Sequence, residues 1–536
     1  MTLPQMASAP GRLCVVLGVA LALLLSLCLP ARADTLGDVR KNGKLLWGGD
    51  EEGGAPYVFP RDDDPNKATG FEFELAEGIA GYLKVKAELS QGNWDKMPDL
   101  LKAQKIDIIL NGYEWSAPRA ELMESSRPYY VYALQLLTRK DDPSLQSWAD
   151  LKKSIGGQKR RIGVLVGSAA DKYVTDTLGD TVDISRYEGN TDSMREAETG
   201  KVDASVQDTP IASFYAARFP KLHPVGEPVA EGYYVVFARK GEVALIRSVN
   251  EAIILMLRTG QLERIYRKYG IWDARQARLG QIMEDAKFFG LSGAVEAELT
   301  KGGPLPTEQA VQISARKGGL QIVREYAWVM IQSAGMTVLL AALSFPIAVM
   351  VGILIAVGRV YGSPIVRLPL TAYVEFLRGT PLMLQLYFIF FFLPEVGLRI
   401  PAFATAIMGL AVNYSAYESE VYRAGLQAIP PGQMEAALSL GMTRGMAIRR
   451  VIVPQAARIV IPPVVNDFIA LFKDTSVCSV VTIMELTKRY SVVSMSTQAT
   501  IELMIMTAIL YLVMSYPMSI VARTLEKRLG TPPQGT

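Results

Sequence analysis

The pattern of apolar and polar positions divides the chain into two parts of different character. Between residues 34 and 272, short strand-like apolar runs alternate with stretches whose apolar residues recur every three or four positions. From about Trp328 the apolar runs become long enough to cross a bilayer. These runs cover residues 329–357, 368–393, 403–422, 459–483 and 501–521. The sequence therefore predicts an α/β domain followed by an all-α transmembrane domain of about five helices.

Within the α/β part, the spacing of apolar residues predicts individual strands and helices. Two runs look alike, residues 133–140 and 232–240, and such a pair would suit two strands that cross between two lobes at a hinge. Further strands are expected at residues 44–47, 106–110 and 161–166, and helices at residues 73–83 and 249–269.

The start of the chain has the layout of a secretory signal. Arg12 precedes an apolar run at residues 13–29, which is followed by Ala31-Arg32-Ala33. Residues 1–33 are therefore expected to be a signal peptide, and the domain that follows is expected outside the cytoplasm. The basic residues agree with this orientation, because they are dense between the third and fourth spans and after the fifth. The predicted outer loops are poorer in them, with Arg399 and the pair Lys488-Arg489.

The composition of the chain limits the ligands and partners that it is expected to bind. A net charge of +3 over 536 residues gives no reason to expect a nucleic-acid partner. Three cysteines and one histidine supply no metal cluster, so neither a metal nor a cofactor is expected. No G-x-x-x-x-G-K-[ST] loop occurs, and the chain therefore cannot cradle ATP phosphates in that way.

A polar segment between the third and fourth spans stands out. Pro430 and Pro431 end the preceding helix, residues 433–440 are good helix formers, and Gly441 sits where a left-handed C-terminal cap would end them. A second helical run is expected to end at Pro454. The segment offers no nucleophile with a base, but it suits docking into a groove of another protein.

This segment resembles the EAA coupling loop of ABC importer permeases. Glu435-Ala436-Ala437 and Gly441 have the family's spacing, and Val451-x-Val453-Pro454 follows with two valines where the family has isoleucine and leucine. Residues 375–382, 416–425 and 473–476 are also similar to permeases for amino acids. The resemblance implies that a separate ABC ATPase subunit grips this loop. One loop per chain, against the usual pair of ATPases, implies that the permease dimerises, most simply as a homodimer.

Residues 34–272 resemble the periplasmic binding proteins for polar amino acids, which implies a two-lobed α/β fold. The matching pieces include residues 48–50, 55–57, 70–75, 106–109, 128–130, 163–168 and 202–208. The resemblance places Arg119 at the clamp for the ligand carboxylate, with Ser168 as its helper, and Asp208 where the α-ammonium binds. It places Trp94 in the pocket wall, and Asp50, Tyr57 and Gly112 in stretches that touch the ligand.

The pocket departs from the family at Glu114, where an acid replaces a hydroxyl. Together with Asp50 and Asp208, Glu114 makes the pocket acidic, which indicates a ligand with a cationic or polar side chain. If Glu114 instead only pairs the ammonium, the charge of the ligand side chain stays open. Glu72 and Glu74 are interpreted as a solvated helix start rather than as ligands.

These observations predict the membrane subunit of an ATP-driven importer of polar amino acids. It is expected in the bacterial inner membrane, with its binding domain in the periplasm. The predicted division is a signal peptide at 1–33, a binding domain at 34–272, a linker at 273–318 and a permease at 319–536. Glu418 and Glu420 could line the translocation path. The alternatives are a ligand-gated ion channel, which would need a filter loop that is absent, and an enzyme on the binding-protein fold.

Overall fold

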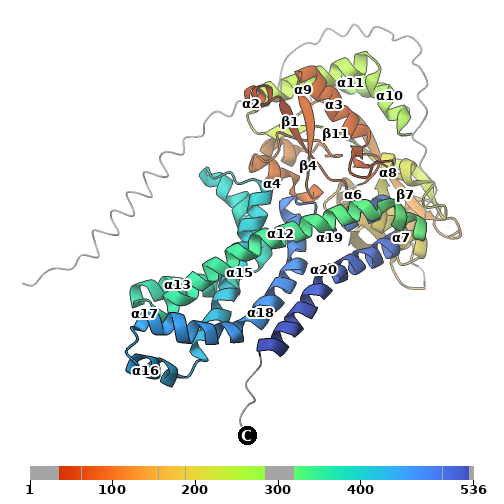
Figure 1. Cartoon of the computed structure of the whole chain (residues 1–536). Coiled ribbons are helices and arrows are strands. Elements are labelled where there is room, and N and C mark those ends of the chain that lie inside the picture. Colours follow the sequence, from red (N-terminus) through yellow and green to blue (C-terminus); the bar gives the residue numbers. More distant parts are fainter. Residues whose placement is uncertain are drawn as a thin grey trace, which may run out of the picture.

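The structure is a computed structural model that describes residues 35–283 and 319–529, apart from positions 53, 62, 155, 188 and 498. The predicted signal peptide and most of the predicted linker lie outside the described residues. Figure 1 shows an α/β part (residues 35–283) that rests on one end of a bundle of long helices (residues 319–529). The division into an α/β domain and a helical domain is therefore confirmed.

The first lobe of the α/β part, lobe 1, is built on a five-stranded sheet in the order β4-β1-β5-β12-β6. Strand β1 pairs in parallel with both β4 and β5, and its apolar side chains Leu45 and Trp47 are fully buried. A run buried in this way needs helices on the sheet faces. The strands are β1 (Lys44–Gly49), β4 (Lys86–Gln91), β5 (Ile108–Ile109), β6 (Met123–Ser125) and β12 (Phe237–Arg239), and the helices include α3 (Phe71–Leu83), α5 (Ala117–Leu122), α9 (Val243–Arg258) and α10 (Gln261–Lys268).

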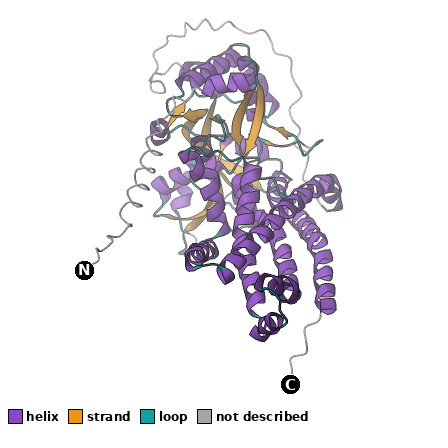
Figure 2. Ribbon diagram, turned by 60° about the vertical axis from the view of Figure 1, so that its left-hand side comes forward, coloured by secondary structure: helices purple, strands orange, loops and turns teal. Residues whose placement is uncertain are grey.

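The second lobe, lobe 2, has a five-stranded sheet in the order β11-β7-β10-β8-β9. Its strands are β7 (Tyr130–Arg139), β8 (Arg160–Leu165), β9 (Val182–Tyr187), β10 (Ala204–Asp208) and β11 (Leu222–Tyr234). Helices α6 (Ala169–Leu178), α7 (Asn190–Thr199) and α8 (Thr209–Tyr215) connect the parallel strands. Figure 2 shows the two sheets as separate groups of strands, each covered by helices.

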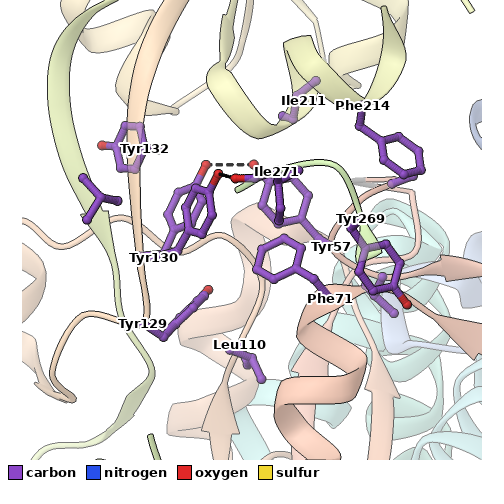
Figure 3. Packing of buried hydrophobic residues seen from close by; sticks show 14 of the residues in the cluster. Tyr57, Phe71, Leu110, Tyr129, Tyr130, Tyr132, Ile211, Phe214, Tyr269 and Ile271 are labelled. Carbon is purple, nitrogen blue, oxygen red and sulfur yellow. Dashed lines mark hydrogen bonds between the residues drawn. The ribbon is translucent and has the colours of Figure 1, made fainter. Parts of the chain in front are cut away.

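The chain crosses between the lobes twice, from β6 to β7 and back from β11 to β12. The predicted run 232–240 spans the return crossing, whereas the run 133–140 lies within β7 in lobe 2. A cluster of tyrosines fills the space beside the crossings (Figure 3). The Tyr234 ring stacks on those of Tyr130 and Tyr132, with centroids 5.7 Å and 4.7 Å apart. The hinge is therefore stiffened by aromatic packing.

Helices occur in the helical part wherever an apolar run predicted a span. They are α12 (Leu320–Tyr361), α13 (Pro364–Gly379) with α14 (Leu382–Tyr387), α15 (Ala402–Gln427), α18 (Val453–Asp474) and α20 (Thr500–Leu529). By length and composition, three helices of the described residues could cross a membrane, or up to four if the pair 364–379 and 382–396, bent by 109°, is one span. The acids Glu418 and Glu420 lower the apolar character of α15.

Two expected helix boundaries are wrong. The predicted helix 249–269 is interrupted at Gly260, whose φ of 70° starts α10 in a new direction. The second error is the opposite one, because the helical run that was expected to end at Pro454 continues beyond it. Helix α17 (Arg444–Ala447) continues through a π-helical turn at Ile448–Ile452 into α18. Pro454 closely follows the π-helical turn, whose hydrogen bonds depart from the regular i→i−4 pattern that a proline would interrupt.

Gly70 shapes the loop that carries Tyr57. It has a φ of 136°, and a Cβ at this position would lie 2.0 Å from the Tyr57 carbonyl oxygen. We expect Gly70→Ala to lower the free energy of unfolding of the α/β part by about 3 kcal/mol or more, because backbone strain adds to the clash. Gly43→Ala is the matched control, since Gly43 has a φ of 68° with nothing within 4 Å. It should cost only about 1 kcal/mol. Urea unfolding measures both, and equal losses would contradict the role of the clash.

Candidate ligand-binding site

A cavity of about 40 Å³ lies between the two lobes. Lobe 1 contributes Asp50, Tyr57, Trp94, Gly112 and Glu114 to its lining, and lobe 2 contributes Ser168 and Asp208. All seven are residues that the sequence predicted for the site. The volume holds only a few waters, so the lobes are closed on each other.

Arg119, the remaining predicted residue, is not part of the lining of this cavity, but it contacts two lining residues, Trp94 and Glu114. Its guanidinium lies over the rings of Tyr113 and Trp94, 4.6 Å and 5.3 Å from their centroids. Its Nη1 donates to the Glu114 carboxylate over 2.6 Å and to the Glu114 carbonyl oxygen over 3.0 Å. The aromatic rings fix the guanidinium from its faces and leave its edges to bind an anion.

Glu114 connects Arg119 to lobe 2. Its second carboxylate oxygen accepts a hydrogen bond of 3.0 Å from the backbone N–H of Ala169, in the first turn of α6. Ser168 caps that helix, accepting from the Asp171 N–H over 3.2 Å. A guanidinium and a helix N-terminus together form a site for a carboxylate. In the closed cleft, the chain's own Glu114 therefore occupies the donors that a ligand carboxylate would use.

Asp208 lines the cavity from lobe 2, at the end of β10. The Tyr234 hydroxyl donates to its carboxylate, and the Tyr57 hydroxyl lies 2.7 Å from that of Tyr234. Burial raises the pKa of Asp208 to about 8, and the negative charge of Glu114 adds to the shift. Asp208 is therefore mostly protonated in the empty cleft at neutral pH, and a cation placed beside it would favour the ionised form.

Asp50 is held by three N–H donors from lobe 1. Its carboxylate accepts from the backbone of Trp94 over 2.9 Å, from the backbone of Glu52 over 2.9 Å and from the side chain of Gln91 over 2.8 Å. Burial raises the pKa of Asp50 to about 6, and the positive charge of Lys488 opposes that shift. The hydrogen bonds orient this carboxylate in the cavity wall.

The interpretation of Glu72 as a solvated residue is wrong. Its side chain is completely buried, and its Oε1 accepts hydrogen bonds from the Gly112 N–H over 2.6 Å and from the Tyr129 hydroxyl. Burial raises the pKa of Glu72 to about 8. Glu72 therefore fixes the stretch that carries Gly112 and Glu114. Glu74 is partly exposed and pairs with Lys268 over 2.7 Å.

Sequence reasoning also missed several polar and apolar residues of the cavity. Gln207 lies in a motif that matched the family, but its side chain was not assigned a role. The remaining lining residues that were not predicted are Asn111, Leu165, Ala170, Asn190, Val206 and Ile211. They come from strands or the positions after them and from the first turns of α6, α7 and α8, where neither periodicity nor charge marks them.

The predicted coupling loop forms α16 (Pro431–Ser439), far from the α/β part (Figure 1). Gly441 has a φ of 80°, and the Met442 N–H donates to the Ala437 carbonyl over 3.2 Å, which is a Schellman cap. Glu435, Ala436 and Gly441 are exposed, whereas Ala437 is buried. The apolar side chain of Leu440 is 80% exposed.

The acids of α15 do not line the described cavity of the helical part, but Glu420 lies 4.0 Å from Arg378, which does. That cavity has a volume of about 540 Å³, and its lining includes Arg378, Asp467 and Asp474 but neither Glu418 nor Glu420. Glu420 pairs with Arg423 over 2.6 Å and with Arg359. A role of these acids in translocation stays a prediction.

Comparisons with known proteins match both parts of the chain. Residues 48–271 match the bacterial extracellular solute-binding proteins, family 3. Residues 348–531 match the binding-protein-dependent transport system inner membrane component. The probable glutamine ABC transporter permease protein GlnM of Bacillus subtilis is 39% identical over 193 residues, which cover 36% of this chain and 89% of the relative. The chain belongs to the family of binding-protein-dependent inner membrane transport components.

A second curated relative agrees with this assignment. The glutamine transport system permease protein GlnP of Escherichia coli K12 is 33% identical over 202 residues, 37% of this chain and 92% of the relative. Among solved structures, the ancestral amino acid-binding protein AncCDT-1 is 27% identical to this chain. The alignment covers 44% of this chain and 99% of AncCDT-1, with a TM-score of 0.41.

The family membership confirms several predictions. The chain joins a solute-binding domain to an ABC permease domain, and it resides in the inner membrane with the solute-binding domain on the periplasmic side. The relatives of the helical part are permeases rather than enzymes. The ion-channel alternative gains no support from these matches.

The raised pKa of Asp208 leads to a test by pH. Between its ordinary value of 3.8 and about 8, the folded form holds a proton that the unfolded chain has lost. The free energy of unfolding should therefore fall as pH rises, by about 1.4 kcal/mol per pH unit, up to about pH 8. Asp208→Asn should remove the contribution of Asp208 to this slope, while that of Glu72 remains, and the variant should so gain stability over the natural chain as pH rises. Urea unfolding between about pH 5 and pH 8 measures both slopes. If the free energy of unfolding changes with pH equally in the natural chain and in Asp208→Asn, Asp208 is ionised in the folded protein.

Proposed function

We propose that this chain is the receptor and permease subunit of an importer for polar amino acids, driven by a separate ATPase subunit. The observation that carries the proposal is the closed cleft. Arg119 and the α6 N-terminus offer donors for a carboxylate, and Asp208 offers an acceptor for an ammonium. A zwitterionic head group needs both at once.

The charge of the cleft favours a cationic ligand side chain. The carboxyl groups of Asp50, Asp208 and Glu114 face the cavity, while Arg119 supplies a positive charge next to Glu114. An incoming carboxylate displaces Glu114 from Arg119 and from the Ala169 N–H. Glu114 is then free to pair a cation, either the α-ammonium or a basic side chain. The two relatives named for glutamine leave a ligand with a neutral side chain as the second candidate.

Helix α16 has the properties of a docking element for the ATPase. It is short, exposed and ended by a glycine cap, and Leu438 and Leu440 present apolar side chains to the outside. A short helix with exposed leucines fits a hydrophobic groove on a partner. One such helix per chain suits a homodimer of the helical part, which would present two docking helices to two ATPase subunits.

We keep the predicted domain limits with one addition. Residues 34–272 are the receptor, residues 319–536 the permease and residues 273–318 the tether. The start of the tether lies against the receptor, because the Gln276 side chain bonds to the backbone of Val131 and Leu279 is buried.

Calorimetry of the purified chain against the twenty amino acids tests the ligand. We expect one or more polar amino acids to bind, with arginine and lysine strongest. Arg119→Ala should weaken that binding by about thirtyfold or more, because a buried carboxylate loses its partner at a cost of about 2–5 kcal/mol. Arg61→Ala is the control, since Arg61 pairs with Asp63 on the surface of the same lobe.

The possible outcomes separate the parts of the proposal. Binding of glutamine or asparagine alone would keep the importer and limit Glu114 to pairing the ammonium. Binding that survives Arg119→Ala would remove Arg119 from the carboxylate clamp. The absence of binding by any amino acid would contradict the substrate class.

Coupling to the ATPase is tested at Leu440. Leu440→Asp should abolish co-purification with the ATPase subunit and amino-acid uptake, because a charge would enter an apolar groove. Amino-acid binding should stay unchanged, since Leu440 directly follows α16, which lies far from the α/β part. Leu122→Asp is the matched control, because Leu122 is 75% exposed on the α/β part. If Leu440→Asp keeps both the ATPase and uptake, α16 is not the docking element.

A further inference from the structure

Helix α19 (Leu486–Thr497) lies between α18 and α20 at the end of the helical part that meets the α/β part (Figure 1). It carries Lys488-Arg489, the basic pair of an outer loop that the proposed function leaves without a role. The helix packs against both lobes of the α/β part, and the two sets of contacts come from its two ends.

The first end of α19 holds lobe 1. The Lys488 ammonium lies 2.7 Å from a carboxylate oxygen of Glu52 and 2.7 Å from the side-chain oxygen of Asn93. The Lys488 side chain is only 4% exposed. Arg489 adds a long hydrogen bond of 3.4 Å to the Pro65 carbonyl oxygen. The buried Glu485 fixes this end by accepting from the Lys488 N–H over 2.6 Å.

The last turn of α19 contacts lobe 2. The Arg218 guanidinium, which follows α8, donates to the carbonyl oxygen of Ser496. Gly189, just before α7, lies against Met495, where a Cβ on the glycine would come within 2.9 Å of the methionine methyl. Neither Arg218 nor Gly189 belongs to the ligand cavity.

Lobe 1 has further attachments to the helical part. The Asn66 side chain donates to Gln332 of α12 over 2.8 Å, and Lys102 pairs with Glu395 over 3.0 Å. The Lys105 ammonium lies over the Phe390 ring, 4.5 Å from its centroid. Lobe 1 is therefore seated on the helical part, and opening of the cleft moves lobe 2.

We propose that α19 is a gauge of lobe closure, which binds lobe 1 permanently and lobe 2 only when the cleft is shut. The proposal rests on the proposed function and adds the segment by which the permease detects an occupied receptor. A helix of 12 residues is a rigid element about 18 Å long. With one end fixed on lobe 1, its other end can meet Arg218 and Gly189 at only one lobe separation.

The closed state on which this depends is held by bonds between the lobes. Ala169 of lobe 2 donates to Glu114 of lobe 1 over 3.0 Å, and the Ala55 N–H of lobe 1 donates to the Tyr215 hydroxyl of lobe 2 over 3.1 Å. Loss of these bonds frees lobe 2 to rotate about the two crossings. The contacts of Met495 and Ser496 would then break while those of Lys488 persist.

Two cysteine pairs in the full-length chain, in a Cys478→Ser background, test the gauge. The lobe 1 pair is Glu52→Cys with Lys488→Cys, and the lobe 2 pair is Gly189→Cys with Met495→Cys. Each is oxidised without amino acid and with L-arginine or L-glutamine, while calorimetry on the same preparation records binding. The lobe 2 pair should cross-link about fivefold faster or more with a bound amino acid, as a two-state equilibrium shifts to closed. The lobe 1 pair should stay unchanged.

A second arm needs no ligand. Glu114→Ala with Tyr215→Phe removes both lobe-bridging bonds and should slow cross-linking of the lobe 2 pair alone. Equal changes in the cross-linking rates of both pairs, in either arm, would overturn the proposal for α19. Both lobes would then approach and leave the helical part together. An unchanged lobe 2 pair in a preparation that binds amino acid would overturn the proposal too. If neither amino acid binds, the ligand proposal is at fault, and the second arm still decides on the gauge.

Discussion

The structure depends on how the closed cleft accommodates several carboxyl groups at once. Asp50, Asp208 and Glu114 come together in a small cavity, and ionised carboxylates in such a place repel one another and lose their hydration. Each is stabilised differently. Glu114 forms an ion pair with Arg119, Asp50 receives three N–H donors, and Asp208 keeps a proton near neutral pH. The fold around the cleft supplies these partners.

Under the proposed function, this arrangement would let an amino acid favour closure. In the closed cleft, Glu114 uses the donors of Arg119 and of α6, and Asp208 is mostly protonated at neutral pH. A zwitterion brings its own carboxylate to those donors and a cation to the acids. Glu114 and Asp208 can then both be ionised beside a positive charge, which the empty cleft does not provide. The free energy gained by the acids adds to that of the ligand contacts.

The parts of the site that could be predicted are those set by short stretches of sequence. Ser168 and Asp208 each sit in a compact motif and both line the cavity, whereas Arg119, matched as a single residue, contacts the lining through Glu114 and Trp94. The burial of Glu72 could not be predicted, because its partners Gly112 and Tyr129 lie 40 and 57 residues away in the sequence. The pairing of Glu114 with lobe 2 and the continuation through Pro454 likewise depend on tertiary contacts. Periodicity cannot show such contacts, since it reports only which face of an element is apolar.

The fusion of receptor and permease changes what docking can signal. A tethered receptor has a high effective concentration at its own permease, so it stays docked whether or not it holds a ligand. The ion pair of Lys488 with Glu52 and the contacts of Asn66 and Lys102 fit such standing attachment. If docking is constant, occupancy must be reported by a change within the docked receptor, and the separation of the lobes is the property that a ligand alters. A helix fixed to one lobe and reaching the other converts that separation into contacts made or lost at the end of α19. This end lies directly before α20, so the same contacts act on a helix of the permease itself.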